Sequence, residues 1–341
     1  MRKLIFGCAL LLAAVVVSCA GNKSADTKAD EPKYELLTYV WSGGKTLPDP
    51  NLVTAINYGF GRVNSTRDGV TIENEDRLRE VVALKKQNPD LKVMLAIGGG
   101  CSEGFTDLAA CDSCRKAFAA DCRRLIEEFG LDGIDFDRES PGFPDGTPED
   151  VDNFEYLLKD MREALGEDKI ISVASMAGAL GMKLPDIIKY VDYFNAMEYD
   201  MTWTRLGSHT SMRESEVGGF DYNVERSMAT YAEKGVPAEK IMLGLAFYGR
   251  GDGKNFPEWT EYRDIVVQPG MEVRWDSIGC VPYIVDSLGQ FALGYDDARS
   301  LAIKCQYVKD LGLRGAMIWR AEQDDDSLTL THTVSSLILN R

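Results

Sequence analysis

Residues 131–139 read LDGIDFDRE and place three acids at alternate positions. In a β-strand successive side chains point to opposite faces, so Asp135, Asp137 and Glu139 share one face while apolar side chains occupy the other. Neighbouring carboxylates repel one another, and burial makes their charged forms costlier still. The stretch therefore predicts a carboxylate cluster at the end of a buried strand, where repulsion raises one pKa and makes a general acid near neutral pH. Glu139 is outermost along the strand and is best placed to reach a substrate.

Two other interpretations of this stretch fit less well. A solvated edge strand would leave only a thin apolar face to form a core. A calcium loop of the EF-hand type, counted from Asp135, needs Gly at its sixth position and Glu at its twelfth, where the sequence has Ser140 and Gly146. The only histidines are His209 and His332, which give little support to histidine catalysis or a His-rich metal site. No cofactor and no metal are therefore expected.

Short apolar runs alternate with helical segments from Glu35 onward, a pattern typical of parallel βα units. The expected strands are 36–41, 52–61, 91–97, the acidic stretch, 170–176, 191–199, 240–248 and 314–319. Eight such strands over about 300 residues predict an α/β fold, a single (β/α)8 TIM barrel with its site at the carboxyl ends of the strands. About 65 residues separate the last two strands and predict a small β excursion. An open doubly wound sheet is the alternative, but no G-x-G-x-x-G turn follows the first strand.

The acidic stretch resembles the D-G-x-D-x-D-x-E signature of glycoside hydrolase family 18, which contains chitinases and endo-β-N-acetylglucosaminidases. Five further segments are similar to motifs of that family, and they are AINYGF at 55–60, AIGG at 96–99, MEYD at 197–200, LGLAFYGR at 243–250 and GAMIW at 315–319. Together the matches span about residues 36–320, nearly the whole chain after its leader. The resemblance implies hydrolysis of β-1,4 linkages in glycans that contain N-acetylglucosamine, such as chitin or chitooligosaccharides.

The chemistry that the resemblance implies is a retaining hydrolysis in which the substrate assists. Glu139 would protonate the leaving oxygen while the 2-acetamido carbonyl of the −1 sugar attacks the anomeric carbon. An oxazolinium ion would form, and water would open it as Glu139 acts as a base. Asp137 would accept a hydrogen bond from the acetamido N–H, Asp135 would hold Asp137 and share its proton, and Tyr199 would bond the acetamido oxygen.

The remaining substrate contacts are implied by the same resemblance. Asp200 and Arg250 would make polar contacts to the substrate, and Trp319 would form an indole floor under the −1 ring. The wall would be completed by Tyr39, Phe60 and Met197. For several of them a purely structural role is the alternative: Phe60 and Met197 suit packing equally well, and Arg250 could pair with an acid. The other tryptophans are sugar platforms by residue type alone, and they are Trp41, Trp203, Trp259 and Trp275.

Two departures from the family pattern fall near the acid. The glycine pair is often followed by a tryptophan that stacks on the +1 sugar, and Gly100 stands there instead. The D-W-E-Y-P form common in chitinases is replaced by DRESP at 137–141. These changes favour soluble chitooligosaccharides, or the chitobiose core of N-glycans, over crystalline chitin. Chitinase-like activity is preferred to endo-β-N-acetylglucosaminidase activity because 197–200 and 243–250 follow the chitinase form. A non-catalytic glycan-binding barrel is the third alternative, and the presence of Glu139 argues against it.

Composition and the first residues indicate a compartment. The net charge of −16 makes nucleic acid an improbable partner and suits a neutral ligand. Arg2 and Lys3 precede an apolar run over 4–17, and VVSC at 16–19 looks like a lipobox. We therefore expect a lipoprotein signal peptide over 1–18, a lipid-modified Cys19 and flexible tether over 19–33, and a catalytic barrel over 34–341. The protein is expected to be a monomer of the bacterial cell envelope that meets the membrane only through its lipid anchor. Ordinary signal cleavage is the alternative.

Six cysteines follow the leader, an even number that makes disulfides plausible in an exported protein. They are Cys101, Cys111, Cys114, Cys122, Cys280 and Cys305. The spacing of Cys111 and Cys114 is compatible with a zinc or redox pair, although a structural bridge or buried thiols are favoured because no second half-site is present. The pairing is left open.

Overall fold

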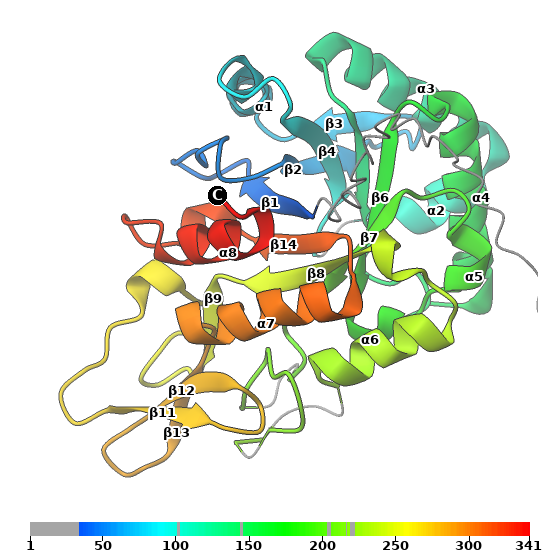
Figure 1. Cartoon of the computed structure of the whole chain (residues 1–341). Coiled ribbons are helices and arrows are strands. Elements are labelled where there is room, and N and C mark those ends of the chain that lie inside the picture. Colours follow the sequence, from blue (N-terminus) through cyan, green and yellow to red (C-terminus); the bar gives the residue numbers. More distant parts are fainter. Residues whose placement is uncertain (1–33, 101–102, 144–145, 203–205, 216, 219–221) are drawn as a thin grey trace, which may run out of the picture. The chain divides into compact units, whose positions relative to one another are not determined.

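The computed structural model describes residues 34–341 except 101–102, 144–145, 203–205, 216 and 219–221. Within these residues, eight parallel strands form a closed barrel (Figure 1). In spatial order they are β1 (Glu35–Trp41), β2 (Ala55–Val63), β4 (Lys92–Gly98), β5 (Gly133–Asp137), β6 (Ile170–Met176), β7 (Tyr193–Met197), β8 (Ile241–Ala246) and β14 (Gly315–Trp319). The ring closes because β1 pairs in parallel with both β2 and β14. The predicted (β/α)8 barrel is confirmed.

Strand boundaries differ from the sequence prediction by a few residues, and one difference matters. The acidic strand β5 ends at Asp137, so Glu139 lies two residues beyond it rather than on it. Ser140 has a positive φ of 64° and donates its N–H to the Arg138 carbonyl at 2.6 Å. Glu139 therefore stands at the centre of a tight turn at the barrel rim, and its direction is set by that turn instead of by strand alternation.

Helices surround the barrel in the expected βα alternation (Figure 1). They are α1 (Glu75–Ala83), α2 (Phe105–Ala110), α3 (Asp112–Phe129), α4 (Pro148–Leu165), α5 (Leu184–Ile187), α6 (Val224–Glu233), α7 (Ala298–Leu311) and α8 (Thr329–Leu339), with short 3-10 turns at η1 (Leu84–Lys86), η2 (Ala177–Ala179), η3 (Ala238–Lys240), η4 (Tyr262–Asp264) and η5 (Ala321–Gln323). The larger hydrophobic core lies between strands and helices, and a smaller one fills the barrel with residues such as Leu37, Met94 and Met242. A short strand, β3 (Val70–Ile72), extends β2 in antiparallel pairing.

Helix α4, which follows the acidic strand, shows how local sequence sets the elements. Thr147 accepts a hydrogen bond from the Asp150 N–H, Asp150 accepts one from the Thr147 N–H, and Pro148 occupies the first helical turn. This capping box satisfies donors that a helix start leaves unpaired. Gly166 ends the helix at a φ of 71°, a conformation that glycine adopts without penalty.

The segment between β8 and β14 forms the predicted β excursion. Its antiparallel sheet has the order β10-β9-β13-β12-β11 in the described chain. The strands are β9 (Tyr248–Gly251), β10 (Thr260–Glu261), β11 (Glu272–Asp276), β12 (Val281–Val285) and β13 (Phe291–Gly294), and Figure 1 shows β11 to β13 lying together beyond β9. A small core of its own includes Phe256, Ile284 and Leu293. Because β9 begins two residues after β8, this sheet grows directly from the barrel rim.

The expected signal peptide, Cys19 and tether lie outside the described residues, as do Cys101 and Trp203. Cys111 and Cys114 form a disulfide at the start of α3, while Cys122, Cys280 and Cys305 are free thiols. No helix of the described chain is apolar and long enough to cross a bilayer.

Candidate active site

Asp135 lies at the bottom of the site, where three strands supply its hydrogen bonds. The Tyr39 hydroxyl of β1 donates to Asp135 Oδ2 at 2.6 Å. The Ser172 hydroxyl of β6 and the Asn195 amide of β7 donate to Asp135 Oδ1 at 2.6 and 3.0 Å. Burial raises the pKa of Asp135, and these hydrogen bonds oppose the shift by stabilising the carboxylate. The carboxyl is thus held in one orientation from three sides.

Asp137 is the next acid along β5, and one of its carboxyl oxygens accepts no hydrogen bond from the described residues. Its side chain is 3% exposed, and Oδ1 has no hydrogen-bond partner within the described part of the chain. Burial, then the charges of Glu139 and Asp135, raise its pKa well above the usual range. A buried carboxyl oxygen without a partner is costly unless a ligand satisfies it. Asp137 is therefore arranged to accept a hydrogen bond from a donor that enters the cavity.

The glycines after β4 allow the acidic strand to come this close. Gly98 pairs with Asp137 across the strands, and the Gly99 N–H donates to the Asp137 carbonyl at 2.8 Å. A side chain at Gly98, whose φ is 125°, would collide with that carbonyl. At Gly100, by contrast, a Cβ would meet Glu139 Oε1 at 3.6 Å and, apart from its chain neighbours, no other atom of the described residues within 4 Å. Glycine thus stands beside Glu139 where the family pattern has a tryptophan.

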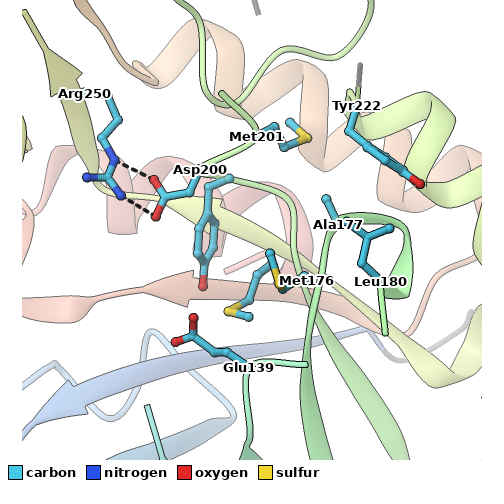
Figure 2. A pocket seen from close by; sticks show the side chains of 10 residues that line it. Glu139, Met176, Ala177, Leu180, Asp200, Met201, Tyr222 and Arg250 are labelled. Atoms are coloured by element: carbon cyan, nitrogen blue, oxygen red, sulfur yellow. Dashed lines mark hydrogen bonds and ion pairs between the residues drawn. The ribbon is translucent and has the colours of Figure 1, made fainter. Parts of the chain in front are cut away.

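Glu139 faces a cavity with two lobes. The first, which we call the Trp319 lobe, has a volume of about 220 Å³ and is lined by Tyr39, Gly100, Asp137, Tyr248, Trp259 and Trp319. The second, the Met176 lobe, has a volume of about 330 Å³ and is lined by Met176, Ala177, Leu180, Met201, Tyr222 and Arg250. Glu139, Met197, Tyr199 and Asp200 line both. Glu139 therefore stands at the junction, and Figure 2 shows it among the side chains that line the Met176 lobe, with its carboxyl directed toward the side of Asp200.

The pKa of Glu139 suits a proton donor. Burial raises it, and the negative charge of Asp200 raises it further. Tyr199 lies nearby with its hydroxyl 3.8 Å from the Met317 sulfur, and burial and the charge of Asp137 raise its pKa well above 10, so the phenol stays protonated. Tyr199 can therefore donate a hydrogen bond at neutral pH, and the upward shift of the Glu139 pKa favours the protonated form that a general acid needs.

Aromatic rings form one wall of the Trp319 lobe. The Trp319 ring lies 5.3 Å from the Tyr39 ring and 6.0 Å from the Phe60 ring, measured between centroids. Trp319 and Tyr39 line the cavity, while Phe60 stacks against Trp319 and is 6% exposed. An indole face of this kind suits the apolar face of a sugar ring.

Asp200 and Arg250 form an ion pair that the sequence could only suggest. Arg250 Nε and Nη2 contact the two Asp200 oxygens at 2.7 Å each (Figure 2). The Nδ1 atom of His209, a fully buried residue, lies 3.4 Å from Asp200 Oδ1 and accepts the Asp200 N–H at 3.3 Å. Burial alone would raise the pKa of Asp200, but the neighbouring His209 and the Arg250 guanidinium outweigh it and hold the pKa well below its usual range. Asp200 is charged beside Glu139.

Trp259 is the candidate platform that reaches the cavity. Its ring stacks on Tyr248 and lines the Trp319 lobe together with a third cavity of about 570 Å³ in the excursion. Trp41 is exposed at the end of β1 under Arg320, with the Arg320 guanidinium carbon 4.8 Å from the ring centroid, and Trp275 lies in β11 beneath Arg299. Neither of these two lines the three cavities.

Polar or aromatic residues of the site that sequence reasoning missed include Ser172, Asn195, His209, Tyr222 and Tyr248. Ser172 and Asn195 gave a weak signal at most, because the expected strands 170–176 and 191–199 contain other polar residues as well. In the described part of the chain, no group of three or more metal-binding side chains is placed to hold an ion.

Comparison with known proteins identifies the family. The model of the family Glycosyl hydrolases family 18 matches residues 30–324. Chitinase A1 of Niallia circulans is 30% identical over 297 residues, which cover 72% of this chain and 42% of that protein, so the chain spans less than half of its length. Chitotriosidase-1 of Mus musculus is 28% identical over 81% of this chain and 68% of its own.

A solved structure gives the same result. The glycoside hydrolase family 18 N-acetylglucosaminidase from Paenibacillus barengoltzii superposes with a TM-score of 0.79 at 29% identity, covering 89% of this chain and 99% of that chain. The resemblance seen in the sequence is thereby confirmed, and the chain belongs to family 18 of the glycosyl hydrolases.

Proposed function

We propose that this protein cleaves β-1,4 linkages of chitin or chitooligosaccharides by the retaining, substrate-assisted mechanism. The observation that carries the proposal is the arrangement of the three acids, with Asp135 buried at the bottom of the site and Asp137 and Glu139 lining a cavity that Trp319 walls. Among these acids Asp137 is the one with a buried oxygen that has no partner in the part of the chain that the structure describes. An acetamido N–H is a donor that matches it, whereas a glucose ring has no such group.

In the proposed reaction the −1 sugar occupies the Trp319 lobe and its leaving group occupies the Met176 lobe. Glu139, at the junction, gives its proton to the oxygen that joins them. The bond from the anomeric carbon to that oxygen breaks as the acetamido oxygen bonds to the same carbon, forming the oxazolinium ion. Water then attacks the anomeric carbon, Glu139 takes a proton from the water, and the acetamido group is restored.

The neighbouring groups support each stage of this reaction. Asp137 accepts the acetamido N–H and offsets the positive charge that develops, while Tyr199 donates to the acetamido oxygen and orients it for attack. Asp135, held by Tyr39 and two other donors, keeps Asp137 in place and shares its proton.

The residues beside the proton donor separate chitin from other substrates. Gly100 stands where the family pattern has an aromatic platform, which supports soluble oligosaccharides over crystalline chitin and leaves the chitobiose core of N-glycans as the alternative substrate. Mass spectrometry of products from chitooligosaccharides, a high-mannose glycoprotein and cellooligosaccharides tests this. We expect cleavage of the first, with the β-anomer formed initially by NMR.

Three outcomes would contradict the proposal in different ways. Cleavage of the glycoprotein alone would identify an endo-β-N-acetylglucosaminidase. Binding of chitooligosaccharides without turnover would identify a glycan-binding barrel. Comparable cleavage of cellooligosaccharides, which lack the acetamido group, would rule out the substrate-assisted mechanism.

We also propose that the protein is a lipid-anchored monomer of the bacterial cell envelope. Support comes from the charged and apolar leader and the VVSC sequence at 16–19. Full-length protein expressed in bacteria should fractionate with membranes and carry an N-terminal diacylglyceryl mass, and Cys19→Ala should remove both properties. Release of the wild-type chain into the soluble fraction without added lipid mass would contradict the anchor. Size-exclusion chromatography of residues 34–341 tests the monomer.

A further inference from the structure

Glu198 is a buried acid that the proposed reaction does not use. It lies between two site residues, Met197 and Tyr199, yet its own side chain is 1% exposed and reaches helix α6. There the Ser227 hydroxyl donates to Glu198 Oε1 at 2.5 Å. The second oxygen, Oε2, finds no hydrogen-bond partner among the residues that the structure describes. A buried carboxyl group on the strand that carries the site calls for an explanation.

Ser227 connects Glu198 to the loop that follows β6. Its hydroxyl oxygen accepts the Gly178 N–H at 2.6 Å. On the other side of the loop, Lys234 Nζ donates to the carbonyls of Gly178 and Ala179 at 3.1 and 3.0 Å. Glu198 thus orients Ser227 by accepting its proton, and Ser227 in turn fixes the backbone at Gly178.

This loop is the wall of the Met176 lobe. Ala177 and Leu180, on either side of the fixed backbone, line the lobe directly. Tyr222, another lining residue, lies so close to Gly178 that a side chain there would collide with its ring, and the φ of 68° at Gly178 also favours glycine. The position of this wall therefore depends on the hydrogen bond between Gly178 and Ser227.

We infer that Glu198 is a positioning residue which, through Ser227 and Gly178, places the wall against which the leaving group binds. The inference rests on the proposed function, because that function puts the leaving group in the Met176 lobe. It predicts that the contribution of Glu198 is confined to the leaving-group side of Glu139.

The protonation of Glu198 is consistent with this role. Burial raises its pKa to about 8, although Ser227 and Lys304 act in the opposite direction. The phenols of Tyr231 on α6 and Tyr307 on α7 also face it, and burial, followed by negative charges that include Glu198, raises the pKa of both, so they are neutral neighbours. A neutral acid at physiological pH can be replaced by an amide of the same shape, which provides a conservative variant.

The experiment compares a substrate with a ligand that lacks a leaving group. Chitotetraose hydrolysis reports both sides of the cavity. A chitobiose thiazoline is a stable mimic of the cyclic intermediate. It would occupy the −1 site and the neighbouring site on the side away from the leaving group, and would leave the Met176 lobe empty. The variants are Glu198→Ala and Ser227→Ala, with Glu198→Gln as the conservative rescue. Thr230→Ala on the same helix is the matched control, since among the residues described its hydroxyl donates to the Arg226 carbonyl and to no group of the wall.

We expect Glu198→Ala and Ser227→Ala to raise KM for chitotetraose about tenfold, because the loss of one buried hydrogen bond changes an equilibrium constant by about that factor. The change in kcat should be smaller. The inhibition constant of the thiazoline should stay within about twofold in every variant. Glu198→Gln and Thr230→Ala should behave as wild type. If Glu198→Ala does not fold, Ser227→Ala carries the same comparison.

Two results would overturn the inference while leaving the proposed function intact. One is an unchanged KM for chitotetraose in Ser227→Ala, and the other is an equal loss of thiazoline binding and of turnover, which would indicate a general structural role. A wild-type protein that neither cleaves chitotetraose nor binds the thiazoline would instead reject the proposed function, and the inference with it.

Discussion

Trp259 lies parallel to Tyr248, with the ring centroids 3.6 Å apart and the planes inclined by 10°. Tyr248 begins β9 beside the barrel, whereas Trp259 belongs to the excursion and is 36% exposed. The stack fixes the indole between the Trp319 lobe and the third cavity, which also includes Asn255 and Glu261. A glycan that extends away from the −1 sugar would therefore meet a rigid aromatic surface.

Replacing this indole should weaken binding of long substrates. We expect Trp259→Ala to raise KM for chitohexaose about threefold to tenfold, because an aromatic surface that contacts a sugar ring is lost. The shortest substrate that is cleaved should show a smaller change, and Trp259→Phe should recover part of the loss. Steady-state kinetics on a series of chain lengths measures this. An equal effect at every length would show that Trp259 only supports Tyr248.

Removing the proton donor should abolish most activity without unfolding the protein. Glu139→Gln keeps the shape of the side chain but cannot protonate the leaving oxygen, so kcat should fall at least about 10²-fold. Asp137→Asn should also slow turnover, since it loses the acceptor for the acetamido N–H. Exposed Glu163→Gln on α4 is the control and should retain full activity. Near-normal turnover by Glu139→Gln would exclude Glu139 as the acid.

The charge of Asp200 should be visible in the pH profile. Burial raises the pKa of Glu139 and the negative charge of Asp200 raises it further, and activity requires the protonated acid. Asp200→Asn removes that charge and leaves Arg250 positive, so the pKa of Glu139 should fall. The alkaline limb of kcat/KM should then move to lower pH. Asp90→Asn, at the amino end of β4, should leave the limb in place, and an upward shift in Asp200→Asn would contradict the assignment.

Glu198 should make stability depend on pH in a defined direction. Its pKa is about 8 in the folded chain, against 4.5 as the ordinary value, so the folded state binds more protons between these limits. The favourable effect of the neutral acid is complete below about pH 4.5 and is lost as pH rises through 8. The Glu198→Gln variant has no group that titrates at this position. As pH rises from about 4.5 to 8, its unfolding free energy relative to wild type should therefore increase, by up to about 1.4 kcal/mol per pH unit.

Urea unfolding of both proteins between pH 5 and 9 measures this difference. Glu233→Gln, an exposed change in the same helix, should run parallel to wild type throughout. A constant gap between Glu198→Gln and wild type would mean that Glu198 does not titrate in this range.

The sequence predicted those parts of the site that local patterns encode. Alternation along 131–139 gave the shared face of Asp135 and Asp137, and the order of apolar runs gave the barrel. The turn that aims Glu139 was not predictable, because it depends on the backbone at Ser140 rather than on strand geometry. The hydrogen bonds that orient Asp135 could not be predicted either. Its partners Ser172 and Asn195 are brought to it by the register of the neighbouring strands in the closed barrel.

Residues contributed by the loops were the hardest to foresee. Trp259 meets Tyr248 because β10 pairs with β9 in antiparallel register, and its residue type alone could not distinguish it from Trp275. His209 was given no role, and its place beside Asp200 follows from the path of the chain after β7. Neighbours brought together by loops and irregular hairpins have no periodic signal in the chain.

The antiparallel sheet between β8 and β14 carries Trp259 but none of the three acids. If the proposed function holds, chain-length selectivity and bond-breaking are encoded by separate stretches of the polypeptide. Residues 252–294 could then be exchanged for a shorter or longer hairpin to change the length of glycan that is bound, and the proton donor would need no redesign.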